Sequence, residues 1–191
     1  MEYNPKKKKI VLQKELSNLD KLVLKFIKIL EKYMDYVIVS GYVSILLGRT
    51  RATEDVDIFI KKVPEKQFLN LYQELKKEGF WCINTENGKE MFNYLQEGLA
   101  IRFAKKGKIV PNFEIKFPKR KIDEETFKDL IVVKIHNKVL KISSLERQIA
   151  FKNFYLKSDK DLEDATHIEE IFKDKLNYRK INKLKEILER E

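Results

Sequence analysis

Residues 40–60 read SGYVSILLGRTRATEDVDIFI and contain the pattern that decides the fold. Ser40 and Gly41 end the β-branched run YVIVS, which predicts a buried strand. VSILLG then predicts a short helix closing at Gly48, and DVDIFI predicts the next strand. A strand, a tight turn, a short helix and a second strand therefore bring small residues and two carboxylates toward one place.

Asp55 and Asp57 are the candidate catalytic residues of the second strand. Side chains two positions apart on a strand point to the same face, so the two carboxylates lie side by side. Oxygen ligands arranged in this way suit Mg²⁺ or Mn²⁺, which bridge protein carboxylates and substrate phosphates. The turn at Ser40 and Gly41 leaves room for phosphate oxygens, and N–H groups at a helix start attract anions. The sequence therefore predicts that a metal ion and a triphosphate meet here.

This arrangement resembles the polymerase-beta-like nucleotidyltransferase superfamily, in which a small Gly-Gly or Gly-Ser pair precedes Asp-x-Asp on a strand. The fuller string is similar to the minimal branch that includes the AbiEii-type toxins and uncharacterised prokaryotic relatives, where Arg-x-Thr-x-Asp-h-Asp recurs. The matching residues are Gly41, Arg51, Thr53, Asp55 and Asp57. Ser40 stands where the first glycine is usual, and a positive φ at this position would strain the loop.

The resemblance also implies a third carboxylate on a later strand flanked by apolar residues. Glu114 in NFEIKF is the candidate, and Asp123 is an alternative. Glu114 has a structural interpretation as well, as the exposed residue of an alternating strand whose Phe113 and Ile115 are buried. On the catalytic interpretation, Asp55, Asp57 and Glu114 are both the catalytic residues and the metal ligands.

A second stretch, ISSLERQIAFKNFYLKSDKDLEDATHIEEIF, resembles the same branch, in which a helix with a Lys precedes Lys-Asp-Leu-x-Asp at the start of the next helix. The matching residues are Lys152, Lys160, Asp161 and Asp164. Lys152 is expected to reach a phosphate as a point charge. Asp161 orients that lysine or caps the helix, and Asp164 is expected to be structural. The implied nucleotide-binding residues are Ser40, Gly41, Arg51, Thr53, Lys152 and Asp161.

Hydrophobic periodicity predicts the remaining elements. Helices are expected over residues 16–34, 64–78 and 89–96, strands over 80–83, 99–104 and 110–117, and two further strands turning near Asn137. From Ser144 the chain is expected to be helical to its end, with breaks near Ser158 and Asn177. The fold class is therefore α/β (α+β), a nucleotidyltransferase-type mixed sheet flanked by helices. The expected domains are a core of residues 1–143 and a helical extension of residues 144–191 packed on it.

Composition excludes several other classes of protein. Apolar residues make up 43% and charged residues 37% of 191, which is typical of a globular chain. No apolar run approaches the roughly 20 residues that cross a bilayer, and no secretory signal is recognisable, so we expect a cytoplasmic protein without membrane contact. Cys82 in GFWCI is expected to be a buried thiol without a role. His136 and His167 have no partner cysteines, which argues against a zinc site.

Charge is unevenly distributed along the chain, whose net charge is +10. Residues 105–121 hold seven Lys or Arg against one Glu, and residues 159–174 hold seven acids against two Lys. A basic surface favours partners that carry phosphate, such as nucleotides or RNA, although a solvated Lys-rich surface explains the same composition.

These observations predict a metal-dependent nucleotidyltransferase that transfers a nucleoside monophosphate from an NTP such as ATP to a hydroxyl acceptor. The acceptor is RNA such as tRNA, bound by residues 105–121, or a protein or a small molecule. A toxin-antitoxin role with an antitoxin partner follows from the branch resemblance. The alternatives are a catalytically worn nucleotide- or nucleic-acid-binding regulatory protein of the same fold, and an antitoxin-like partner protein.

Overall fold

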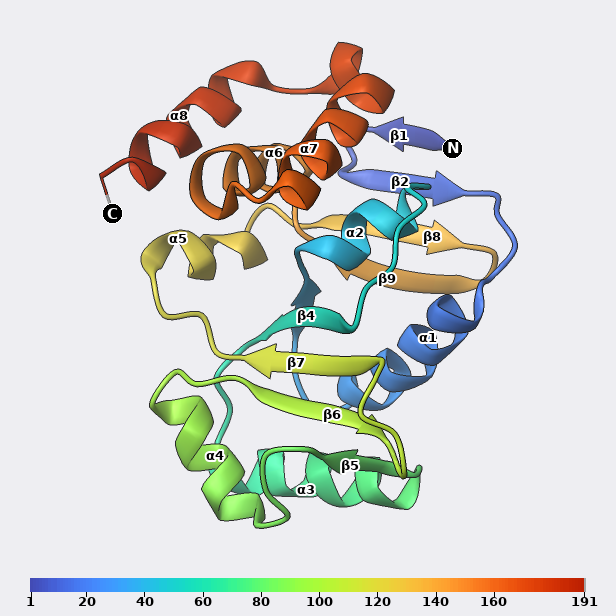
Figure 1. Ribbon diagram of the computed structural model, residues 1–191, viewed down its shortest axis with the longest axis vertical. Helices are drawn as coiled ribbons and strands as arrows, with labels where there is room; N and C mark the ends of the chain where they lie inside the picture. Colours follow the sequence, from blue (N-terminus) through green and yellow to red (C-terminus); the bar gives the residue numbers. More distant parts are fainter. Residues whose placement is uncertain (191) are drawn as a thin grey trace.

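The computed structural model describes residues 1–190, which form a mixed α/β fold around one nine-stranded sheet (Figure 1). The strand order is β1-β2-β8-β9-β3-β4-β7-β6-β5. The strands are β1 Glu2–Asn4, β2 Lys9–Leu12, β3 Tyr36–Ile38, β4 Asp55–Ile60, β5 Phe80–Cys82, β6 Ile101–Lys105, β7 Asn112–Lys116, β8 Ile131–Ile135 and β9 Lys138–Ile142.

The helices precede, connect and follow these strands. They are α1 Asn18–Leu30, α2 Gly41–Leu46, α3 Glu65–Lys77, α4 Gly88–Gln96, α5 Lys121–Glu124, α6 Leu145–Phe151, α7 Asp159–Phe172 and α8 Tyr178–Leu188. A π-helical turn, Lys152–Leu156, continues α6, and short 3₁₀ turns follow α5 and α7. No helix within residues 1–190 is both long and apolar enough to span a membrane.

The sheet is mixed because its central strands pair in both directions. β4 pairs with β3 in antiparallel fashion and with β7 in parallel fashion, and β6 runs antiparallel to β7. On the other side, β3 pairs in parallel with β9, where Ile38 lies opposite Ile142. Parallel pairs need a crossover connection, so the β4–β7 and β3–β9 pairs join segments that are far apart in the sequence.

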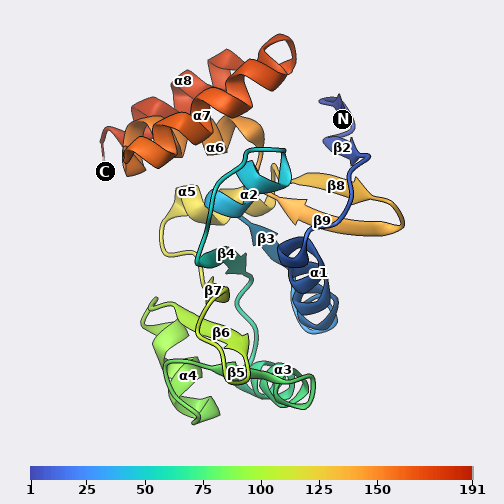
Figure 2. The same cartoon turned by 45° about the vertical axis from the view of Figure 1, so that its right-hand side comes forward.

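The two faces of the central sheet differ in chemistry. On β4, Val56, Ile58 and Ile60 are fully buried, whereas the alternating Asp55, Asp57 and Phe59 are only partly buried. The apolar face packs on α1 and α3, which lie on the same side of the sheet in Figure 2. The Phe26 ring of α1 stacks on Phe113 of β7 with a centroid distance of 3.9 Å. The opposite face is therefore the one on which the polar β4 residues lie.

The C-terminal helices pack close to the short helix that precedes β4. α6 contacts both α7 and α8, and α7 contacts α2. Their buried residues belong to the same apolar cluster as those of the sheet, including Leu145, Ile149, Ile168 and Leu184. The helical C-terminal region is confirmed, with Ser158 and Asn177 capping α7 and α8 where breaks were expected. The domain boundary after residue 143 stays a prediction.

The fold class and most of the predicted elements are confirmed, and two differences are informative. The strand expected over residues 110–117 is shorter, and the sequence analysis contains no strand before Leu16, where β1 and β2 form a hairpin. Ile10 is fully buried because β2 pairs in parallel with β8, residues 131–135. That burial depends on a distant strand, so local periodicity does not reveal it.

Replacing Phe26 by Ala is expected to lower the free energy of unfolding by about 3–5 kcal/mol, because it leaves a cavity beneath Phe113. The exposed control Ile109→Ala is expected to change it by less than about 0.5 kcal/mol. Urea denaturation of both variants measures the difference. Equal losses would show that the ring stack is not a main packing contact.

Candidate active site

Three carboxylates lie on neighbouring strands in one register. Asp57 of β4 is directly opposite Glu114 of β7, and Asp55 is opposite Asn112. Residues in register on adjacent strands project from the same face, so Asp55, Asp57 and Glu114 share the polar face of the sheet. The side chains of Asp57 and Glu114 are 19% and 14% exposed. The structure thus brings the predicted catalytic residues together, and Glu114 is not a solvated surface residue.

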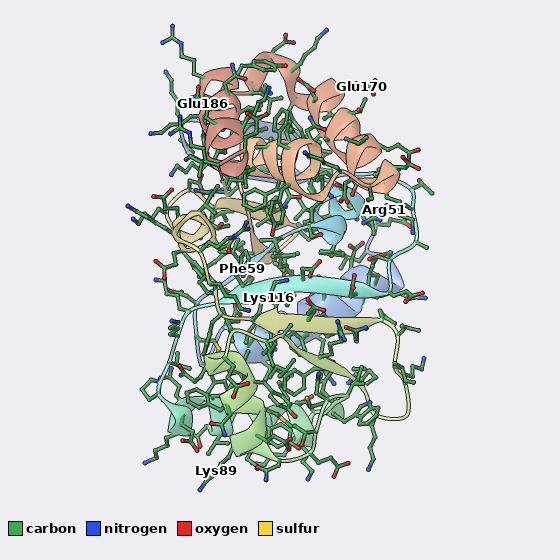
Figure 3. The ribbon with its side chains drawn as sticks, turned by 60° about the vertical axis from the view of Figure 1, so that its left-hand side comes forward. Arg51, Phe59, Lys89, Lys116, Glu170 and Glu186 are labelled. Atoms are coloured by element: carbon green, nitrogen blue, oxygen red, sulfur yellow. The ribbon has the colours of Figure 1, made fainter. Side chains whose placement is uncertain are left out.

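Two cations from the sheet balance part of this negative charge. Nζ of Lys116 lies 3.3 Å from Oε1 of Glu114 and 3.6 Å from Oδ1 of Asp57. Arg102 of β6 donates from Nε and Nη2 to Oε2 of Glu114, at 3.0 and 2.7 Å. Two cations therefore face three carboxylates. Figure 3 shows Lys116 beside Phe59 on β7 and β4, as their register requires.

The same surroundings shift the pKa values of Asp57 and Glu114 in opposite directions. Burial raises the pKa of Asp57, and the carboxylates of Asp55 and Glu114 add to this effect against the opposing influence of Lys116 and a Ser40 hydrogen bond. Burial alone would raise the pKa of Glu114 as well, but Lys116 and Arg102 together hold this pKa below its usual range. Asp57 is therefore the better proton acceptor, and Glu114 stays charged.

The Ser40–Gly41 turn joins β3 to α2 in a strained conformation. Ser40 has φ 61° and ψ −141°, a region that residues with a Cβ rarely occupy and that costs about 1–3 kcal/mol. The departure from the usual glycine therefore falls on a position where glycine is favoured. At Gly41 a Cβ would overlap the Arg51 guanidinium, so a larger residue there would displace the Arg51 side chain.

Thr53 and Arg51 fix the chain before β4. Oγ1 of Thr53 donates to the backbone oxygen of Asp55 at 2.9 Å, which orders the entrance to the strand. Arg51 packs over Gly41, and its Nε lies 3.4 Å from Oδ1 of Asp164 on α7. Both predicted residues therefore support the turn and the strand that present the carboxylates.

A buried network of charges connects this loop to the C-terminal helices. Nζ of Lys152, a residue that is 1% exposed, lies 2.7 Å from Oδ2 of Asp164 and 3.1 Å from Oδ1 of Asp161. Arg49 pairs with the same Asp164 from the loop after α2. Asp164 is fully buried and carries the structural role expected of it. Of the two roles expected of Asp161, the structure shows the contact with Lys152, whereas the N-cap of α7 is Ser158, whose hydroxyl accepts from the Asp161 amide.

A cavity of about 430 Å³ opens beside the carboxylates. Of the predicted site residues, Ser40, Asp57 and Lys152 line it. The rest of its wall combines aromatic and cationic side chains, among them Phe59, Phe151, Tyr155, Lys116, Lys119, Arg120 and Arg147. A volume of this size is in the range of small-molecule and cofactor sites. The arrangement suits a ligand that combines a planar ring with negative charge.

The donor set fits a hard divalent cation in its chemistry. Asp55, Asp57 and Glu114 offer oxygen only, and Oδ1 of Asn112, buried opposite Asp55, has no hydrogen-bond partner among residues 1–190. No three His, Cys, Asp or Glu side chains in this part of the chain are already arranged as a metal-binding group. The Lys116 ammonium lies between Asp57 and Glu114, where it compensates their charge.

Two further expectations concern residues around the cavity. Asp123 pairs with Arg120 at the start of α5 and lines the cavity, but it does not lie on β4 or β7 with the other carboxylates. The basic segment 105–121 is divided between the β6–β7 loop and the cavity wall, which Lys116, Lys119 and Arg120 line. Cys82 is buried, and burial raises the pKa of its thiol.

Comparison with solved structures identifies the fold. The lincosamide antibiotic adenylyltransferase LnuA, solved with lincomycin bound, is similar with a TM-score of 0.53 and 13% identity over 83% of this chain and 99% of that one. The solution structure of the antibiotic-resistance factor ANT(2'')-Ia is similar with a TM-score of 0.52 and 14% identity, over 89% of this chain and 92% of that one. This chain has a nucleotidyltransferase-type fold. An antigenic nucleotidyltransferase-like protein from Paracoccidioides brasiliensis matches at 20% identity over 79% and 75%, with a TM-score of 0.49.

Comparison by sequence adds no closer relative, since no protein-family model and no curated protein matches the chain. The likeness to the solved structures concerns the fold, and the AbiEii-type branch stays a prediction.

Sequence reasoning missed four residues of the site. Lys116 follows Glu114 by two positions, so strand alternation alone would have placed it on the same face. Arg102 and Arg49 depend on strand register and helix packing, which the sequence does not reveal. Gln148 of α6, whose side chain meets the Ser40 backbone, has no local signal at all.

The raised pKa of Asp57 predicts a pH-dependent effect of Asp57→Asn. A carboxyl whose folded-state pKa lies above its unfolded value destabilises the fold once it ionises, and this penalty is absent below the unfolded value near 3.8. In the presence of a chelator, Asp57→Asn should therefore unfold at a higher temperature than the wild type at pH 7. The difference should disappear as the pH falls toward about 4. The exposed control Asp174→Asn should show no such trend, and a less stable Asp57→Asn at pH 7 would contradict the shift.

Lys152→Met tests the buried charge network. Removing the ammonium leaves the carboxylates of Asp161 and Asp164 with an excess of negative charge, which is expected to lower the unfolding free energy by roughly 3 kcal/mol. Lys160→Met, at an exposed position eight residues away, is expected to change it by less than about 0.5 kcal/mol. Chemical denaturation of the two variants measures the contrast. Similar unfolding free energies for the two variants would mean that the ion pairs of Lys152 make no net contribution to stability.

Proposed function

We propose that this protein is a metal-dependent nucleotidyltransferase that transfers a nucleoside monophosphate from an NTP to a hydroxyl acceptor. The observation that carries the proposal is the register of β4 and β7, which sets Asp57 against Glu114 beside a cavity that Ser40 also lines. The nucleotidyltransferase-type fold supports it, as does the match of Gly41, Arg51, Thr53 and Asp55 to the superfamily pattern.

Asp55, Asp57 and Glu114 would hold the divalent cation, Mg²⁺ or Mn²⁺. When bound, it supplies positive charge that activates the acceptor hydroxyl and neutralises the phosphate oxygens. Burial and the neighbouring carboxylates of Asp55 and Glu114 raise the pKa of Asp57, so a cation at this face would relieve an unfavourable concentration of negative charge. Arg102 and Lys116 keep Glu114 ionised, which suits a ligand more than a base.

In the transfer, the acceptor oxygen forms a bond to the α-phosphorus of the NTP. The bond between that phosphorus and the bridging oxygen breaks, and pyrophosphate leaves with the electron pair. The acceptor proton passes to a carboxylate of this face of the sheet, and from there to water.

The cations of the cavity wall are proposed to bind the phosphates. Lys116, Lys119 and Arg120 line the side of the cavity near β7, and Lys152 lines the side near α6. Lys152 is also held by Asp161 and Asp164, so it would reach a phosphate as an oriented charge. Gly41, Arg51 and Thr53 would act from the turn, by shaping the approach to Asp55 and Asp57.

For the acceptor we favour a small molecule that carries a hydroxyl. LnuA, whose fold this chain shares, was solved with lincomycin bound. The segment 105–121, proposed from the sequence as an RNA contact, places only its second half at the cavity. RNA therefore becomes the second acceptor to test, and a toxin-antitoxin role with an antitoxin partner stays a prediction.

The test is transfer of label from the four α-³²P NTPs, with Mg²⁺, to a panel of hydroxylated small molecules and to total RNA and protein. Asp55→Asn and Asp57→Asn are expected to reduce transfer at least 10²-fold, since each removes a metal ligand. The surface control Asp174→Asn should retain it. Transfer that persists in Asp57→Asn would contradict the assignment.

Calorimetry separates the enzyme from a catalytically worn relative. An active site should bind an NTP with Mg²⁺ and lose that binding in Asp57→Asn. Metal-dependent binding without transfer to any acceptor would favour the regulatory alternative. If RNA becomes labelled and the yield of labelled RNA falls steeply with salt concentration, the acceptor is a polyanion and not a small molecule.

A further inference from the structure

Gln148 of α6 contacts the strained residue of the turn through both of its backbone groups. Its side chain is 4% exposed and lies against Ser40 and Ser143. With Oε1 facing the Ser40 amide, Oε1 accepts from Ser40 N–H at 3.1 Å and Nε2 donates to the Ser40 carbonyl oxygen at 3.2 Å. The hydroxyl of Ser143 donates to the same Oε1. The opposite orientation would set acceptor against acceptor, so the surrounding partners assign the amide.

The sheet places Gln148 at this position. Ile142 of β9 lies opposite Ile38 of β3, and Ser143 N–H donates to the Ile38 carbonyl oxygen at 2.9 Å. α6 starts two residues later, and Gln148 N–H donates to the Ser144 carbonyl oxygen at 3.0 Å. Because β9 pairs in parallel with β3 and leads directly into α6, the Gln148 side chain lies at the end of β3 although it is far away in the sequence.

The conformation of Ser40 explains why such a contact matters. Its φ of 61° lies in the left-handed region, which is favourable for glycine and unfavourable for serine. The backbone therefore tends to relax out of this conformation unless surrounding groups hold it. On the β4 side, Val39 N–H donates to the Asp57 carbonyl oxygen at 2.9 Å, so a shift of the turn would be transmitted to the candidate catalytic strand.

We propose that Gln148 is a positioning residue that clamps the Ser40 backbone and so permits serine at a glycine position of the active-site turn. The clamp keeps Ser40 and Asp57 in the geometry in which they share the wall of the cavity. Its effect on catalysis rests on the proposed function, whereas its effect on the turn does not.

The effect of Gln148→Met in a Ser40→Gly background distinguishes a clamp from ordinary packing. A clamp is needed for serine and not for glycine, so Ser40→Gly should relieve the loss caused by Gln148→Met. Gln148→Met keeps the length of the side chain and removes both hydrogen bonds to Ser40, together with the one from Ser143. Packing alone would give the same loss in either background, because the apolar contacts of residue 148 do not depend on the Cβ of residue 40.

The experiment is a double-mutant cycle of Ser40→Gly and Gln148→Met, read by thermal unfolding and by kcat and KM for nucleotide transfer. Gln148→Met in the serine background is expected to lower Tm by several degrees and kcat by 10- to 100-fold, with a smaller change in KM. In the glycine background both losses should shrink to less than half. The matched control Gln96→Ala, on the exposed surface of α4, should change neither quantity.

Hydrogen exchange of the wild type provides a readout that needs no variant. The Ser40 amide should be protected, because Gln148 accepts its proton. Equal losses in the two backgrounds, or rapid exchange of the Ser40 amide, would overturn the clamp. If the wild type transfers no nucleotide, the Tm cycle and the exchange rate still decide on Gln148, and only the proposed function fails.

Discussion

The parallel pairing of β4 with β7 is the constraint on which the rest of the site depends. It sets Val56 opposite Phe113 and Asp57 opposite Glu114, so one register serves both faces of the sheet. On one face, Phe113 packs on Phe26 of α1. On the other face, the carboxylates of Asp57 and Glu114 are held together. A slip of one residue would exchange the faces and bury the carboxylates in the apolar core, so the stability of the core specifies the geometry of the site.

The C-terminal helices complete the site that the sheet begins. Lys152 of the π-helical turn reaches Asp161 and Asp164 of α7, and Asp164 in turn pairs with Arg49 and Arg51 from the loop before β4. Each of these charges has a partner within a largely buried network. The network therefore fixes the positions of the helices and the loop relative to one another, even where its net contribution to stability is small. The Ser40–Gly41 turn, β4 and the C-terminal helices therefore form one interdependent unit.

The parts of the site that were predictable are those set by local pattern. The alternation of DVDIFI places Asp55 and Asp57 on one face, and the alternation of NFEIK does the same for Glu114 and Lys116. The sequence also predicted the longer helices through their apolar spacing, but not the single turn of α5. It did not predict β1 and β2, because a short edge hairpin acquires its burial only from β8. Arg102, Arg49 and Gln148 were not predictable either, since their contacts follow from strand register and helix packing.

The central claim is that Asp55, Asp57 and Glu114 together bind a divalent cation with the nucleotide. Anomalous diffraction at the manganese edge, from crystals soaked with Mn²⁺ and a non-hydrolysable NTP, tests it directly. The account predicts a manganese peak bounded by oxygens of Asp55, Asp57 and Glu114, with the triphosphate in the adjacent cavity and the base beyond it. Nucleotide bound elsewhere, or bound in the cavity with no manganese peak at these three carboxylates, would contradict it.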